Sequence, residues 1–496
     1  MPATAVSVRL IDRGCPCSVP AVGTTSEVES DPAVTENSFV APIDSRRRST
    51  WVIAWLIALL MCAASVVLYQ MKYPNISPID EFAHIDYAAK LSEGSLVGRG
   101  DRFGTIVMRE FACRRLDASE ISFEVPACNA PEASLRPEVY PENGYNVAFI
   151  HPPTYYVVAA LGGSVAQRFD RSFVAGARLA NLAWIVAFVT MMAIACRWLR
   201  ASPTVFVASC VVCVANPASL HALGTVNPDA AGLFAGVSAL VGYLGWKRSN
   251  RLWWLLLAVV PVAIKSTHGL ATGVVLLLLA ADLFEGWSRQ RTSAGGAPTP
   301  GDTTWRPVSI VAGGSAVVAL AVLAVQRAQA SAPVSVIDQF RRFHVDSLPL
   351  DSLLANVAAI PPLVGYTPLG LKNSWVSLAV VVLSLALGAA ALAAIGLPGR
   401  QVEHEFLRRL GLSTLVTMLL AGPALIVMNF VLSEIYVAVP LRYLISLLPL
   451  IAIVTIAVFD RSRPIRWAWS GLVTSGWLIM VITIGSAVTL SVTTPP

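Results

Sequence analysis

The amino-acid sequence predicts an all-α polytopic membrane protein with about 11–13 transmembrane helices. Composition is the first reason: 55% of the 496 residues are hydrophobic and 13% are charged, whereas a soluble protein carries about 25% charged residues. The second reason is the length of apolar runs such as "WVIAWLIALLMCAASVVLYQ" (51–70), because a helix needs about 20 apolar residues to cross a bilayer. The third is that basic residues cluster between these runs.

The apolar runs define the candidate spans, which are 51–70, 173–195, 203–222, 229–246, 252–264, 266–284, 307–327, 374–396, 409–432, 437–459 and 466–490. The basic clusters orient them: Arg46–Arg48, Arg197/Arg200, Lys247/Arg248/Arg251, Arg289/Arg291/Arg306, Arg400/Arg408/Arg409 and Arg461/Arg463/Arg466. Placing every cluster in the cytoplasm gives about 11 crossings, with the N-terminus inside and the C-terminus outside. The run 151–169 is also apolar, but a full crossing would invert every later span. We therefore expect it to be short and embedded at the outer face.

The hydrophilic segments complete this organisation. Residues 1–50 are rich in Ser, Thr, Pro and Val, end in "DSRRRST", and are predicted to be a disordered cytoplasmic tail. The transmembrane domain is then 51–496. Two long connections, 71–150 and 328–373, fall outside the membrane, and loops of this length are usually functional or disordered. Segment 285–306 is predicted to be a flexible cytoplasmic linker.

The cysteines divide by location. Cys113 and Cys128 share the first external loop, and in an oxidising compartment they can form a disulfide. The cysteines in or beside the apolar runs are most simply small core residues; these are Cys62, Cys196, Cys210 and Cys213.

Charge and motifs exclude several function classes. The net charge of +6 comes from basic residues scattered between spans, so it does not indicate a nucleic-acid partner. The sequence has no Walker loop, no dinucleotide fingerprint and no G-x-S-x-G. These absences argue against a nucleotide-driven pump and against a hydrolase of the common motif classes.

Polar residues gather at the predicted outer face. Five of the six histidines fall there, and only His404 is cytoplasmic. Polar groups beside the apolar slab are costly and often functional, so their convergence predicts an outward-facing active site at the membrane edge. The residues are His84, His151, His221, His268, His344, Asp80, Glu81, Asp229, Lys265 and Arg442.

The stretch "DEFAH" follows the first span closely. If it is helical, Glu81 and His84 lie three residues apart on one face, and Asp80 and His84 lie four apart. A carboxylate placed there can act as a general base, or Glu81, His84 and His268 can bind a divalent cation such as Mg, Mn or Zn. Alternatively, Ser77 caps a surface helix whose dipole favours the two acids.

The remaining outer residues also have two interpretations each. In "GTVNPDAAG", Asp229 is either a second functional acid or the first-turn acid of a helix that an Asn caps and a Pro begins. Lys265 and Arg442 oppose the positive-inside tendency, so they either snorkel or bind an anionic group such as a lipid phosphate. His151 in "HPPTYY" can donate to that phosphate or simply open an interfacial helix.

These stretches resemble the polytopic GT-C glycosyltransferases, whose first external loop carries an acidic pair. In order, "DEFAHIDYAAKLSEG", "HPPTYYVVAAL", "ARLANLAWIVA", "GTVNPDAAG", "AIKSTHG" and "LRYLISLLPL" are similar to an actinobacterial membrane-protein family of that superfamily. The resemblance covers about 78–460 and leaves out the tail, the Cys113/Cys128 region and the last span.

The resemblance implies a plasma-membrane enzyme that moves a sugar from a polyprenyl-phosphate carrier to an extracytoplasmic glycan, lipid or protein, with inversion. It implies that Asp80 is the catalytic acid with Glu81 beside it, and that Asp229 is the second external acid. Lys265, Arg442 and His151 would bind the carrier phosphate. We expect Lys265 and Arg442 to converge near Asp80 because two cations are needed to offset the charge that grows on the phosphate.

Two other classes of function remain open. A lipid or glycan transporter or flippase is also polytopic, but it carries ionisable residues at mid-span, and here the charges lie at the ends of the spans. A non-catalytic envelope-assembly protein would tolerate the loss of Asp80.

Overall fold

The computed structural model describes residues 45–78, 80–114, 125–292, 305–333, 337, 341–358, 402–437 and 441–461. Within them the chain is helical, and its extended pairings are two isolated bridges, Arg102–Tyr145 and His344–Ile435. The predicted all-α class is confirmed. The predicted spans 374–396 and 466–490 lie outside the described residues, as does most of the predicted tail.

The α-helices are α1 (Ser45–Lys72), α2 (Glu81–Ser92), α3 (Thr105–Arg114), α4 (Thr154–Gln167), α5 (Phe173–Leu179), α6 (Asn181–Trp198), α7 (Pro203–Ala215), α8 (Pro217–Gly224), α9 (Gly232–Ser249), α10 (Val260–Ile264), α11 (Gly269–Thr292), α12 (Arg306–Ala328), α14 (Leu350–Ala358), α16 (Val402–Ser433) and α17 (Leu448–Arg461). Short 3₁₀ helices connect them: η1 (Glu132–Ser134), η2 (Pro137–Val139), η3 (Pro141–Gly144), η4 (Val147–Ile150), η5 (Pro228–Ala231), η6 (Leu252–Ala258), η7 (Ser266–His268) and η9 (Leu441–Leu447).

Six helical stretches among the described residues are long and apolar enough to cross a membrane, which indicates a multi-pass membrane protein. They are Ser49–Lys72, Phe173–Trp198, Pro228–Ser249, Ser266–Ser288, Arg306–Ala328 and Glu405–Val431. The pair α7 and α8 makes a seventh if it is one span, bent by 75°. The bend follows from Pro217, which has no N–H for a continuous helix, and from Asn216, whose side chain caps α8 by accepting from Ala218 and Ser219.

The predicted span 252–264 differs from the structure. It consists of η6 and the five-residue helix α10, and it is not among the stretches that satisfy the length and hydropathy criteria. Pro261 stands at the start of α10 and has no N–H to continue the hydrogen-bond ladder from η6. The run 151–169 contains α4, whose 14 residues are fewer than the about 20 that a crossing needs.

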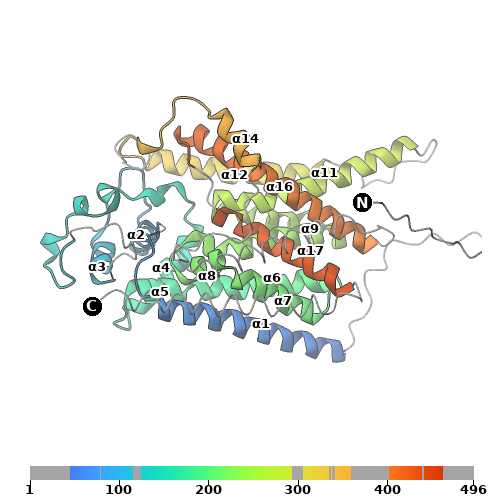
Figure 1. Cartoon of the computed structure of the whole chain (residues 1–496), viewed down its shortest axis with the longest axis horizontal. Helices are drawn as coiled ribbons and strands as arrows, with labels where there is room; N and C mark the ends of the chain where they lie inside the picture. Colours follow the sequence, from blue (N-terminus) through green and yellow to red (C-terminus); the bar gives the residue numbers. More distant parts are fainter. Residues whose placement is uncertain are drawn as a thin grey trace, which may run out of the picture. The chain divides into compact units, whose positions relative to one another are not determined.

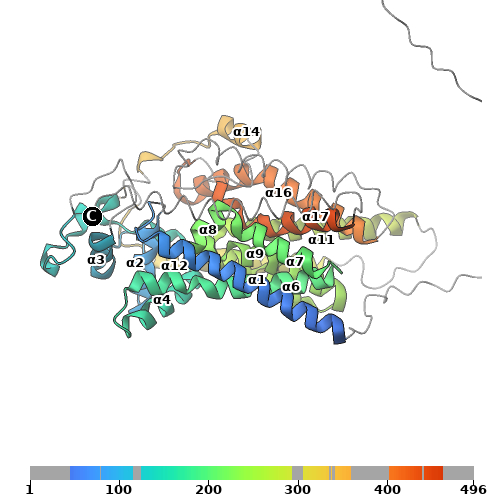
Figure 2. The same ribbon diagram turned by 60° about the horizontal axis from the view of Figure 1, so that its bottom comes forward.

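The long helices α1, α9, α11, α12 and α16 lie roughly along one axis, and α2 and α3 lie at one end of them, which we call the loop end (Figures 1 and 2). The chain after α12 returns to this end, where the Ser331 N–H donates to the Arg99 carbonyl over 2.8 Å. The opposite end is closed by ion pairs of Arg409 with Glu285, at 2.8 Å, and of Asp282 with Lys247, at 3.4 Å.

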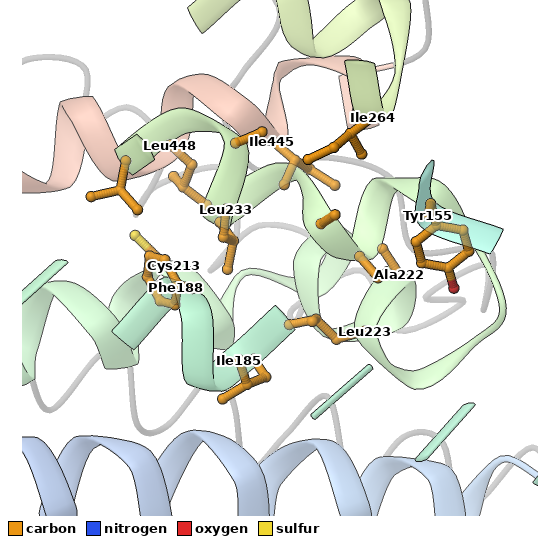
Figure 3. Close-up of a cluster of buried hydrophobic side chains, with 14 of the residues drawn as sticks. Tyr155, Ile185, Phe188, Cys213, Ala222, Leu223, Leu233, Ile264, Ile445 and Leu448 are labelled. Atoms are coloured by element: carbon orange, nitrogen blue, oxygen red, sulfur yellow. The ribbon is translucent and has the colours of Figure 1, made fainter. Parts of the chain in front are cut away.

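The buried apolar core joins helices that are distant in sequence (Figure 3). Ile185 and Phe188 of α6, Leu233 of α9, Ile445 of η9 and Leu448 of α17 belong to it. Close backbone packing brings η9 into this core, because a Cβ added at Gly236 of α9 would lie 1.9 Å from the Ser446 carbonyl oxygen. The core thereby holds η9, which carries Arg442, against α9.

A disulfide joins Cys113 at the end of α3 to Cys128, which is the pairing expected from the sequence. Arg109 of α3 reinforces this link by donating to the carbonyl oxygens of Cys128 and Ala130. The disulfide and the Arg109 contacts hold α3 to the chain that follows it in the first loop.

Candidate active site

Asp80 stands immediately before α2 and has a left-handed backbone conformation, with φ 56° and ψ 1°. Asp and Asn adopt this region more readily than other non-glycine residues. The Asp80 side chain is 39% exposed, and its Oδ2 accepts a hydrogen bond from Arg442 Nη2 at 2.9 Å. The alternative that Ser77 caps a surface helix is wrong, because α2 starts at Glu81 and is buried along Glu81–Ala89.

Glu81 lies in a different environment from its neighbour. Its side chain is fully buried, and Arg178 of α5 donates to both of its oxygens, Nε to Oε1 at 2.8 Å and Nη2 to Oε2 at 2.7 Å. The N–H groups of Ser77 and Val226 also donate to this carboxylate, at 2.7 and 2.8 Å. These contacts leave Asp80 as the more accessible of the two acids.

Arg178 connects Glu81 to the chain around it. It donates to the carbonyl oxygens of Tyr73 and Asn75, at 2.7 and 2.6 Å. Together with the Glu81 contacts, these bonds join α2, α5, the end of α1 and the turn before η5. We call Glu81 and Arg178 the buried clamp. The adjoining His221 ring shares hydrogen bonds with Tyr69 and Ser77, so this histidine belongs to the surroundings of the clamp.

Four charged residues from separate segments meet at the loop end, and we call them the charged cluster: Asp80, Asp229, Lys265 and Arg442. Lys265 Nζ donates to Asp229 Oδ1 at 2.6 Å. Arg442 lies between the two acids, 2.9 Å from Asp80 Oδ2 and 3.5 Å, through Nε, from Asp229 Oδ2. The expected convergence of Lys265 and Arg442 near Asp80 is confirmed.

Local structure places each member of the charged cluster. The Asn227 side chain accepts from the Asp229 N–H at 2.9 Å, and Pro228 begins η5, so the predicted cap is present and Asp229 is also an ion-pair partner. Lys265 follows α10 in an extended conformation and is 2% exposed; its contact with Asp229 excludes snorkelling. The Tyr443 ring lies 4.7 Å from Lys265 Nζ and 5.5 Å from Arg442 Cζ.

Two neutral histidines border the charged cluster. His84 Nδ1 and the Tyr156 hydroxyl share a hydrogen bond of 2.7 Å, and the His84 and His151 ring centroids are 5.3 Å apart. Burial, and then the positive charge of Lys265, lowers the pKa of both His84 and His151 well below 6.5. At neutral pH each ring can therefore donate or accept a hydrogen bond but carries no charge.

The proposed metal ligands Glu81, His84 and His268 are not assembled as one set. Glu81 is occupied by Arg178 and backbone N–H groups, and His268 Nε2 faces the Pro228 carbonyl oxygen at 3.2 Å. Across the described ranges, no group of three or more His, Cys, Asp or Glu side chains is arranged to hold a metal ion. Binding of a divalent cation stays a prediction.

Three residues of the site, Arg178, Tyr156 and Tyr443, have no role predicted from the sequence. Arg178 lies in the quoted stretch "ARLANLAWIVA", inside an apolar segment. An ionisable residue in such a segment is itself a sign of a specific partner, so the importance of Arg178 was detectable from the sequence, although its pairing with Glu81 was not.

Two other histidines have no described contact with the charged cluster. The backbone of His344 forms a β-bridge with Ile435, and the His404 side chain lies outside the described residues.

Comparisons with known proteins identify no family. No protein-family model matches the chain, and no curated protein matches it significantly. Among solved structures, the chain is similar to the crystal structure of ArnT from Cupriavidus metallidurans bound to undecaprenyl phosphate, with 11% sequence identity and a TM-score of 0.41. The match covers 89% of this chain and 74% of that one. A likeness of this size does not indicate a shared function.

Proposed function

We propose that this protein is a membrane glycosyltransferase that takes a sugar from a polyprenyl-phosphate carrier and transfers it to an acceptor outside the cytoplasm. The observation that carries the proposal is the charged cluster, in which a partly exposed carboxylate, Asp80, lies beside the cations Arg442 and Lys265. The order of sequence motifs that resemble the GT-C glycosyltransferases supports the same function.

The proposed reaction needs a base and positive charge. The acceptor hydroxyl oxygen attacks the anomeric carbon, a new C–O bond forms with inversion, and the bond from that carbon to the phosphate oxygen breaks. The hydroxyl proton passes to Asp80, and the electron pair of the broken bond stays on the phosphate. The carrier thus changes from a phosphodiester with one negative charge to a monoester with two. Because phosphate is a good leaving group, no acid is needed to protonate it.

The geometry suggests a role for each residue. Asp80 is the base because water and an acceptor can reach its carboxylate, whereas Glu81 is enclosed in the buried clamp and positions Asp80. Arg442 can hold two phosphate oxygens at once, while Lys265 acts as a point charge. Neutral His151 can add one hydrogen bond. Asp229 holds both cations in place.

The cellular setting follows from the same proposal. The charged cluster would lie on the extracytoplasmic face of the plasma membrane, with the prenyl chain in the lipid. The acceptor would be a cell-envelope glycan, a glycolipid or a protein. Any divalent cation would have to bind at a position separate from the ion pairs of the charged cluster.

The test is transfer activity of the purified protein in liposomes. Wild-type protein, a panel of polyprenyl-phosphate sugars and an envelope extract should yield glycosylated product and polyprenyl monophosphate. Asp80→Asn should lower the rate by about 10²–10⁴-fold, as expected for a lost general base. Asp170→Asn is the matched control, because Asp170 is also exposed and left-handed, with φ 53°.

Two results would contradict the proposal at different levels. Full activity in Asp80→Asn would remove Asp80 from the mechanism. If none of the donors in the panel yielded polyprenyl monophosphate with the wild-type protein, the assignment as a glycosyltransferase would be wrong.

A further inference from the structure

The four charges of the cluster do not contribute equally to the electrostatic potential at a bound anion, because they differ in burial. Asp229 and Lys265 are both buried and form one ion pair at 2.6 Å, and their charges sum to zero wherever the shared proton lies. Arg442 adds one positive charge on the more exposed side of this pair, with its Nε 3.5 Å from Asp229 Oδ2. Asp80 is 39% exposed, so water screens its charge far more than it screens the buried ones. The enclosed part of the charged cluster therefore carries a net charge of about +1.

The Asp229 carboxylate could also accept more hydrogen bonds than its described neighbours donate to it. Its Oδ1 takes the Lys265 bond, whereas Oδ2 is buried and accepts no hydrogen bond from the described residues. This carboxylate faces both cations, so it reduces the positive charge available to any anion that binds them. A fold that only had to bind phosphate strongly would gain from an uncharged residue at this position.

We infer that the anion site formed by Lys265 and Arg442 is matched to a single negative charge, and that Asp229 is the residue that sets this limit. The inference rests on the proposed function and specifies its substrate. A sugar phosphodiester carries one negative charge and fits the site. The polyprenyl monophosphate that remains after transfer carries two above its second pKa, so one of its charges stays unmatched beside Asp229. The site thus favours the donor and disfavours the spent carrier.

The same arrangement links binding to catalysis and release. A phosphodiester that takes Arg442 as its partner replaces Asp80, whose carboxylate is then free to accept the acceptor's proton. When the glycosidic bond breaks, the second negative charge appears on the phosphate while Asp80 takes the acceptor's proton and becomes neutral, so the cations still offset the growing charge during transfer. Once Asp80 has passed this proton to water, the second charge of the monoester is unmatched, and repulsion from the buried Asp229 assists its departure.

Binding of two small probes tests the charge limit without any substitution. Farnesyl phosphate has a second pKa of about 6, so its singly charged fraction rises about 25-fold between pH 7.5 and pH 5.5. Methyl farnesyl phosphate carries one negative charge at both pH values. With the wild-type protein in nanodiscs, the affinity for farnesyl phosphate should rise by up to about 25-fold, whereas the affinity for its methyl ester should not change.

The methyl ester also controls for titration of the protein. The titratable or charged groups around the anion position, in the described part of the chain, come from five segments: Asp80 just before α2 and His84 within it, His151 and Tyr156 at α4, Asp229 of η5, Lys265 and His268 at η7, and Arg442 and Tyr443 of η9. Protonation of any of them would change the binding of both probes together.

Removing the buried charge tests the role of Asp229. In Asp229→Asn the site carries one more positive charge, so farnesyl phosphate should bind more tightly at pH 7.5 and most of its pH dependence should disappear. Asp282→Asn is the matched control, because Asp282 also pairs with a lysine and an arginine, but at the opposite end of the helices. Its probe binding should equal that of wild type.

Each outcome decides a different question. If both probes bind but farnesyl phosphate does not tighten at low pH, or both tighten equally, the charge limit is wrong and the proposed function stands. If Asp229→Asn folds and keeps the wild-type pH dependence, another group sets the limit. If neither probe binds at any pH, the carrier-phosphate site fails and this inference with it. Should Asp229→Asn not fold, the two-probe comparison in wild type still tests the limit.

Discussion

The adjacent acids Asp80 and Glu81 should respond in opposite ways to loss of their charge. Glu81→Gln removes the partner of Arg178 in a pair that is buried on both sides, with 3% and 0% side-chain exposure. Removing one member of such a pair costs about 3–5 kcal/mol, because the other charge stays buried without compensation. The Asp80 pair with Arg442 is 39% and 17% exposed, so Asp80→Asn should cost about 0–1 kcal/mol.

Thermal unfolding in detergent, followed by circular dichroism, measures the difference. We expect Glu81→Gln to lower the melting temperature by several degrees, and Asp80→Asn to leave it nearly unchanged while lowering the transfer rate by about 10²–10⁴-fold. Arg178→Met should resemble Glu81→Gln. The double variant Glu81→Leu/Arg178→Met should be more stable than either single variant, because it buries no lone charge.

One result would refute this reasoning. If Glu81→Gln melted like wild type and lacked transfer activity, Glu81 would take part in the reaction and the buried clamp would not be a structural pair. Loss of activity together with loss of stability, restored by the double variant, would instead support positioning of Asp80 by the clamp.

Two further predictions concern the supports of the site. Replacing Cys113 and Cys128 with Ser should destabilise the first loop by about 3 kcal/mol, the chain-entropy value for a closed loop of about 15 residues; hydrogen exchange of α3 would measure it, and unchanged protection would contradict it. Gly236→Val should lower both the melting temperature and farnesyl phosphate binding, because a Cβ there would lie 1.9 Å from the Ser446 carbonyl oxygen. Gly313→Ala, where a Cβ meets nothing within 4 Å, should change neither, and equal effects of the two substitutions would refute the packing argument.

The sequence predicted features that depend on local composition. Apolar runs of about 20 residues identify spans because a bilayer requires that length, and the six candidate spans coincide with predicted runs. The Asn227–Pro228–Asp229 cap follows from side-chain chemistry within three residues. The failure at 252–264 has a local cause as well, since hydropathy does not register the missing N–H of Pro261.

The sequence did not predict which partner each charged residue would choose. Asp80 and Arg442 are 362 positions apart, and periodicity carries no information about such a pairing. Helical spacing also placed Glu81 three residues and Asp80 four residues before His84, so that each acid would lie beside this histidine on a helix. In the structure Asp80 is left-handed and precedes the helix, so its side chain leaves that face and contacts Arg442, while Glu81 contacts Arg178.

The charged cluster is better explained by function than by stability. Lys265 and Arg442 were unexpected at the predicted outer face, and the structure explains each by an acid beside it. Yet a buried ion pair seldom stabilises a fold more than well-packed apolar residues of similar volume, because desolvation offsets the attraction. A membrane protein that needed only a stable core would have no use for four charges gathered at one end of its helices. These charges are costly to bury, and within the cluster only the side chains of Asp80 and Arg442 are partly exposed. This arrangement favours a site in which a ligand's anion replaces Asp80 as the partner of Arg442.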